Sequence, residues 1–273
     1  MKNPKQFKLI FGMLMLIPLI SCINSSIAST TVKNNVTVAK TKDNPAINIG
    51  TTDAELEKAK KEGNAVFLVI TGTGVTNINN AVTVAKEANG KVKKSVIVQM
   101  NRDESANSSL VLKFGIASVP LPYILVISPK GVPVVGVPSE QATSDKLVKS
   151  IPSPKQDMVL SAVNDKKPVF IIVSKKTFTD KTTVVTNCKA ACSKAASKPA
   201  IVQIDFDDAN EKDFLTQLGV SAPVDGKSII VVINAAGQIT DTFTDSPTVD
   251  NLVTAASKVI KTGGCCSGKK KCG

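Results

Sequence analysis

Short apolar runs alternate with amphipathic segments along most of the chain. The runs have four to six residues and read AVFLVI, SVIVQM, YILVI, VFIIV, AIVQI and IIVVI. Runs of this length are typical of buried strands, and the segments between them have the spacing of helices, the first over residues 53–61. The pattern therefore predicts an α/β protein in which helices cover both faces of mixed sheets.

The two halves of the chain repeat one another. Matched landmarks lie about one hundred residues apart, namely Phe67 and Phe170, Gln99 and Gln203, Gly115 and Gly219, and Gly131 and Gly237. A leading helix is predicted at the start of each unit, over 53–61 and over 155–163. We expect a tandem duplication, with units at 46–152 and 153–261.

Each unit has the predicted order helix, strand, helix, strand, helix, strand, strand, helix, which resembles the thioredoxin fold. The most specific segment is GIASVP, residues 115–120, before a strand predicted over 123–128. It is similar to the thioredoxin segment in which a cis proline precedes the third strand. The resemblance implies that Pro120 is the cis proline, with Pro223 as its counterpart in the second unit, where the segment is one residue shorter. In that family the neighbouring edge contacts the substrate backbone, which implies a peptide groove at Thr76, Val119 and Pro120.

The thioredoxin family places Cys-x-x-Cys just after the first core strand, where a helix N-terminus lowers a thiol's pKa. The matching positions here are 76–79 and 179–182, and they hold no cysteine. Thr76, Thr179 and Asp180 are predicted helix N-caps instead. The chain has no histidine to serve as a base for a threonine nucleophile. The resemblance implies that neither unit is catalytic at the family site.

The N-terminal sequence predicts export from the cytoplasm. Residues 1–21 combine a lysine-rich start with a short apolar run, the pattern of a secretory signal peptide. The junction LISC resembles the bacterial lipobox, which implies that Cys22 is lipidated; cleavage after Ala28 is the alternative. Residues 22–45 form a polar tether. We expect a lipid-anchored protein on the periplasmic side of a bacterial membrane, and Ile23 favours the outer membrane.

The formal charge of +12 comes almost wholly from lysine, because Arg102 is the only arginine. Base and phosphate recognition relies on arginine forks and aromatic stacking, and only 4% of residues are aromatic. This composition argues against a nucleic-acid partner. A protein or peptide partner is expected.

Five cysteines remain after Cys22. Cys188 and Cys192 lie four apart on one predicted helix, and the tail at 262–273 holds Cys265, Cys266 and Cys272. A final helix predicted over 248–261 would end at the same sheet edge, so all five thiols could meet. Copper-delivering relatives of thioredoxin also use Cys-x-x-x-Cys, but at the start of this helix rather than two turns later.

Several states of these thiols stay open. Cys188 and Cys192 could pair with tail cysteines, or four thiolates could bind Zn(II) or Cu(I), or the odd cysteine could bridge two molecules. Cys188 could equally be a core residue. The leading hypothesis is a non-catalytic binding or structural module. The alternative is a metal-handling or disulfide redox protein.

Overall fold

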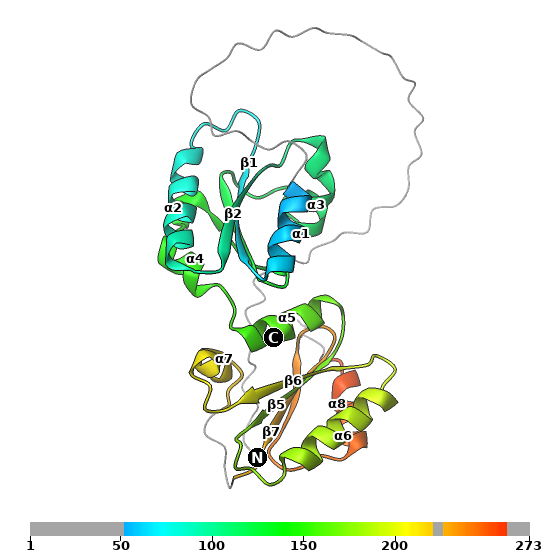
Figure 1. The fold of residues 1–273 in the computed structure, drawn as a ribbon. Coiled ribbons are helices and arrows are strands. Elements are labelled where there is room, and N and C mark those ends of the chain that lie inside the picture. Colours follow the sequence, from blue (N-terminus) through cyan, green and yellow to red (C-terminus); the bar gives the residue numbers. More distant parts are fainter. Residues whose placement is uncertain (1–51, 221–225, 261–273) are drawn as a thin grey trace, which may run out of the picture.

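The computed structural model describes residues 52–220 and 226–260 (Figure 1). The first unit contains a four-stranded sheet built from β1 (Ala65–Thr71), β2 (Ser95–Asn101), β3 (Tyr123–Ile127) and β4 (Pro133–Pro138). Its helices are α1 (Thr52–Glu62), α2 (Ile78–Lys91), α3 (Ser108–Phe114) and α4 (Ser144–Lys149), with short 3-10 turns at Ser105–Asn107 and Ser139–Gln141.

The second unit repeats this series. Its strands are β5 (Val169–Ser174), β6 (Ala200–Asp205), β7 (Ile229–Ile233) and β8 (Ile239–Phe243). Its helices are α5 (Pro154–Asn164), α6 (Lys181–Lys194), α7 (Lys212–Gln217) and α8 (Val249–Ser257), with a 3-10 turn at Ala209–Glu211. The predicted order of elements is confirmed in both units.

Both sheets are mixed and have the same strand order, β2-β1-β3-β4 and β6-β5-β7-β8. β1 runs parallel to β2 and antiparallel to β3, and β3 is antiparallel to β4. β5 has the corresponding partners in the second sheet. Every residue of β1 and β5 is buried, because each is flanked by a strand on both sides and by helices on both faces.

Helices cover both faces of each sheet, as predicted, and two helices lie on each face. In the first unit α1 and α3 pack on one face and α2 and α4 on the other. In the second unit α5 and α7 share one face, while α6 and α8 lie side by side on the other (Figure 1). The two tandem thioredoxin-like domains expected from the sequence are therefore present.

The repeated landmarks occupy equivalent places in the two sheets. Phe67 and Phe170 are fully buried on the central strands, opposite Ile97 and Ile201 of the neighbouring parallel strands. The glycine landmarks have left-handed backbone conformations that L side chains rarely adopt, with φ of 63° at Gly115, 71° at Gly219 and 78° at both Gly131 and Gly237. Two of these glycines follow helices and two lie in hairpin turns, which explains why the repeat retains them.

Two sequence predictions need correction. The cis peptide bond is Leu121–Pro122 and not the bond before Pro120, because Pro122 is the residue that directly precedes β3. The final helix ends at Ser257 rather than 261, since Lys258 has extended backbone. Side chains of the β7–β8 turn donate hydrogen bonds to the main-chain carbonyls after α8. Asn234 Nδ2 donates to Lys258 O at 2.9 Å, and Gln238 Nε2 donates to Ile260 O at 3.0 Å.

The two units meet at α5, which lies between the first unit and the second sheet (Figure 1). Asp157 of this helix is only 3% exposed, and its Oδ2 accepts a hydrogen bond of 3.0 Å from the Lys130 amide in the β3–β4 turn. Its Oδ1 has no hydrogen-bond partner among the described residues. Burial raises the pKa of Asp157, although the Ser128 hydroxyl and Lys130 lower it in part.

We predict that Asp157→Asn stabilises the protein at pH 7. Because the pKa of Asp157 is raised in the folded state, the protonated carboxyl favours folding at pH values below its ordinary pKa of 3.8. This contribution to the free energy of unfolding is lost as the pH rises through the folded-state pKa. Asparagine keeps an oxygen acceptor for Lys130 without the charge. The gain should be about 1 kcal/mol in urea unfolding at pH 7, and it should shrink as pH falls toward 4. Asp165→Asn, just past the end of α5 and with a half-exposed side chain, is the control and should show no such pH-dependent gain. A loss of stability at pH 7 would contradict the prediction.

Candidate functional site

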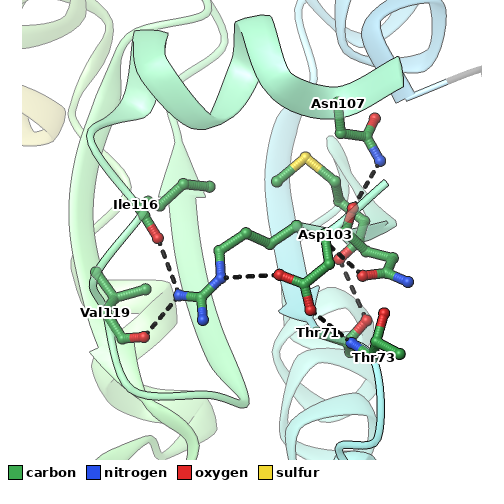
Figure 2. A network of polar contacts seen from close by, with 9 residues as sticks. Thr71, Thr73, Asp103, Asn107, Ile116 and Val119 are labelled. Carbon is green, nitrogen blue, oxygen red and sulfur yellow. Dashed lines mark hydrogen bonds and ion pairs between the residues drawn. The ribbon is translucent and has the colours of Figure 1, made fainter. Parts of the chain in front are cut away.

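The candidate site lies at the end of the first sheet where the thioredoxin family has its active site. Three segments meet there: the loop after β1, the residues after β2 and the segment before β3. β1 and β2 are parallel, so their C-terminal ends lie at the same edge. Figure 2 shows the polar contacts that join the three segments.

Arg102 connects the end of β2 to the segment before β3. Its Nη1 donates hydrogen bonds to the carbonyls of Ile116 at 3.1 Å and Val119 at 2.8 Å (Figure 2). One guanidinium group therefore fixes two points of a loop that has no strand or helix of its own. The rigid planar fork suits this task better than a lysine ammonium.

Asp103 connects the same arginine to the loop after β1. Its Oδ1 lies 3.7 Å from Arg102 Nε, and its Oδ2 accepts a hydrogen bond of 2.7 Å from the Thr73 amide (Figure 2). Asn101 Oδ1 holds the Asp103 amide at 3.0 Å. The three loops at this end of the sheet thus form one connected polar network.

Gly72 allows the closest approach in the site. Continuing the β1–β3 register by two residues places Gly72 opposite Leu121, which precedes the cis bond. A Cβ added at Gly72 would lie 2.6 Å from Leu121 Cδ1 and 2.8 Å from Asp103 Oδ2. Within the described residues, neither the N–H nor the C=O of Leu121 has a hydrogen-bond partner. Leu121 is a half-buried residue, and its main-chain donor and acceptor lie at the edge of the site.

The residues predicted for the peptide groove lie at this end of the sheet. Thr76 and Pro120 are exposed, and Val119 is half-buried with its carbonyl held by Arg102. The N-cap prediction for Thr76 is wrong, because α2 begins at Ile78 and Asn77 occupies the cap position. Asn77 makes no side-chain cap bond, since its backbone is not in the extended conformation that capping requires.

The second unit does not repeat the network within its described residues, 153–220 and 226–260. Phe206 stands in the position of Arg102, and Lys175 pairs with Asp207 at 2.8 Å while lying 5.2 Å from the Phe206 ring. Asp180 is the cap residue of α6, but its carboxylate accepts hydrogen bonds from the amide and hydroxyl of Ser228 at 2.9 and 2.8 Å. The predicted capping role of Asp180 is therefore wrong. Thr179 lies one residue before the cap position. Pro223 lies outside the described residues.

Cys188 and Cys192 are free thiols in the structure. Cys188 is fully buried between α6, α8 and the central strands, and burial, followed by the neighbouring Cys192, raises its pKa to about 12. Cys192 is half-buried, its Sγ–H donates to Pro199 O at 3.1 Å, and burial raises its pKa as well. This environment is that of a core residue for Cys188 and disfavours the thiolate that metal binding or disulfide exchange requires.

The thiol cluster itself stays a prediction. Cys22, Cys265, Cys266 and Cys272 lie outside the described residues. Residues 258–260 pass the β7–β8 turn, at the end of the second sheet opposite the vacant family site, and α6 also runs toward that end. Over 52–220 and 226–260, no three His, Cys, Asp or Glu side chains gather where they could hold a metal ion.

The sequence did not identify Gly72, Arg102, Asp103 or Leu121 as site residues. Two signals were available: the chain has a single arginine, and that arginine and an aspartate follow directly after a predicted strand. The close approach of Gly72 to Leu121 depends on the strand register, which sequence patterns do not give.

Comparisons with known proteins found similar structures but no similar sequence families. No protein-family model matches the chain, and no curated protein sequence matches it. Two structures of the first two thioredoxin domains of Eps1p, from two yeasts, each match this chain at 12% identity and a TM-score of 0.29. The Naumovozyma dairenensis structure covers 82% of this chain and 100% of its own. The Saccharomyces cerevisiae structure covers 81% and 100%.

Trxlp from Edwardsiella tarda EIB202 matches at 12% identity and a TM-score of 0.27, over 36% of this chain and 93% of its own. These identities and scores carry no information on activity. The thioredoxin-like fold stands on the strand order and helix placement of the two units.

We predict that Gly72→Ala destabilises the first domain by about 1–3 kcal/mol, because the added methyl group displaces Leu121 or Asp103. Gly90→Ala is the matched control: a Cβ there meets nothing within 4 Å, and its helical position favours alanine. Thermal and urea unfolding of both variants test this. Equal stability of the two variants would show that the contact at Gly72 is not a constraint.

Proposed function

We propose that this chain is a lipid-anchored protein of the bacterial cell envelope whose first thioredoxin-like domain binds an extended polypeptide without thiol chemistry. The observation that carries the proposal is that the N–H and C=O of Leu121, beside the cis bond, have no hydrogen-bond partner among the described residues. An extended peptide lying along this segment could pair with both groups, as in other cases of main-chain recognition.

The geometry of the loop supports binding because the loop is held before any ligand arrives. Arg102 anchors Ile116 and Val119, and Gly72 lets Leu121 pack against the end of β1. A loop that is already ordered loses less conformational entropy on binding. Ala117, Ser118 and Pro120 are exposed on this loop and would contact the peptide's side chains.

The residues present do not support exchange chemistry at this site. Positions 76–79 read Thr, Asn, Ile, Asn, so the start of α2 offers no thiol. The thiols among the described residues belong to the second unit, and Cys188 is buried with a strongly raised pKa. A binding function requires only the main-chain N–H and C=O of Leu121, which need no thiol.

The cell-envelope location rests on the sequence. The signal-peptide pattern of residues 1–21, the lipobox-like LISC and the polar tether together favour a lipidated Cys22. Within 52–220 and 226–260, no helix has both the length and the apolar character needed to cross a bilayer.

We predict that Cys22→Ser moves the protein from the membrane fraction to the soluble fraction of a bacterial host and abolishes incorporation of radiolabelled palmitate. Serine has no thiol for lipid attachment, whereas Cys192→Ser keeps Cys22 and serves as the control. Incorporation of palmitate into the Cys22→Ser variant would contradict the proposal that Cys22 carries the lipid anchor.

We predict that the mature soluble chain binds a reduced, carboxymethylated model polypeptide, and that Ser118→Trp weakens this binding by about tenfold, or 1.4 kcal/mol. The bulky ring would stand on the exposed loop beside Leu121. Lys86→Trp, on the exposed face of α2, is the control and should leave affinity unchanged. Fluorescence anisotropy measures both. Carboxymethylation blocks thiols, so binding cannot depend on exchange.

An insulin-reduction assay tests the non-catalytic part of the proposal. The expected rate is that of the reductant alone. Turnover that persists after Cys188→Ala and Cys192→Ala would contradict the account of where chemistry could reside.

A further inference from the structure

A cleft of about 700 Å³ lies between the two units, at the end of the first sheet opposite the peptide site. Its walls come from the end of α1, the α2–β2 connection, the β3–β4 turn, the linker between units and α5. Clefts of roughly 300–1,000 Å³ at domain interfaces are the usual size and place for small-molecule sites.

The cleft is rimmed by four exposed lysines, all from the first unit: Lys60, Lys61, Lys94 and Lys130. Within the described residues none of them forms an ion pair with a carboxylate at salt-bridge distance. By contrast Lys91, three residues before Lys94, pairs with Asp145 at 2.6 Å. Within the described residues no acid therefore lies at salt-bridge distance from these four ammonium groups, although Lys130 is close enough to Asp157 to lower the pKa of that carboxyl.

The two acidic residues of the lining are already engaged in other ways. Glu62 accepts a hydrogen bond of 3.0 Å from Asn64. Asp157 is 3% exposed and holds the Lys130 amide, so it lies beneath the surface rather than among the ammonium groups. Four lysines against two carboxyl groups leave the charge of the lining positive.

The positions of the lysines are fixed by the fold at two points. A Cβ on Gly131 would lie 3.0 Å from Lys60 Cδ, so the Lys60 stem lies over the β3–β4 turn. Asp157 holds the neighbouring Lys130 amide in that same turn. The rest of the lining includes apolar side chains from the connections and the linker: Val92, Pro129, Ile151, Pro152 and Pro154.

We propose that this cleft binds a small polyanion that carries several phosphate or carboxylate groups. Lysine ammonium groups act as compact point charges and suit phosphate and carboxylate oxygens without a fixed approach direction. The apolar side chains of the lining add contact area beside the charged groups. The inference does not depend on peptide binding, because the two sites lie at opposite ends of the first sheet.

Binding would also hold the two units together. The lysines belong to the first unit, whereas Pro154, Asp157 and Ser161 belong to α5 of the second. A ligand that fills the cleft contacts both, so it binds the docked arrangement better than the separated one and stabilises it.

The test titrates the mature full-length chain with inorganic tripolyphosphate and, separately, with citrate by isothermal titration calorimetry. The wild type should bind at least one probe saturably with one site, and raising the salt concentration should weaken the binding. Lys61→Glu combined with Lys94→Glu should weaken it by at least about tenfold. Preference for tripolyphosphate would identify phosphate as the recognised group, and preference for citrate would identify carboxylate.

The control combines Lys58→Glu with Lys93→Glu. These lysines are exposed, lie on the same two segments, carry the same charge change and do not line the cleft. The control should stay within about twofold of the wild type. Equal losses in the two variants would mean general attraction to a lysine-rich surface, and no saturable binding of either probe would also overturn the proposal. In the wild type, amide NMR shifts on titration should concentrate at Gly63, Val92 and Ser161, which locates the ligand independently of the variants.

Discussion

The burial of the two central strands on both faces is the constraint on which the rest of the structure depends. β1 and β5 expose no residue, so each must have a strand on either side and helices above and below. This requirement places two helices on each face. Both proposed sites lie at the ends of the first sheet, where loops replace the buried strands.

At one end of the first sheet, the guanidinium group of Arg102 holds the neighbouring loops in place. Arg102 and Asp103 together join the segments after β1, after β2 and before β3. The second unit has Phe206 and a lysine–aspartate pair in the same place, and Asp180 accepts hydrogen bonds from Ser228, the residue before β7. The duplication thus kept the core and changed the end of the sheet, which is consistent with different tasks for the two units.

The sequence predicted the helices and strands well because the apolar runs are short and regular. Because the pattern occurs twice, the assignment in one unit supports the assignment in the other. It predicted the loops poorly. Pro120 and Pro122 both lie just before β3, and only the backbone distinguishes which follows the cis bond. Asp180 is a good N-cap residue by type, yet Ser228, 48 positions later, takes its carboxylate. For Asp180 a tertiary contact decided between local alternatives that the residue type left equal.

The cleft between the units adds a reason for the second domain to exist. Its lysines come from the first domain and could attract an anion alone, but without α5 and the linker the anion would be contacted from one side only. Docking α5 against the β3–β4 turn adds the second wall of the cleft and buries Asp157, whose raised pKa reflects the cost of that burial. An interface that contains a costly carboxylate and unneutralised lysines is weaker than an apolar one of equal size. A bound polyanion would offset the repulsion among the lysines, so occupancy of the cleft would couple to the rigidity of the whole two-domain body.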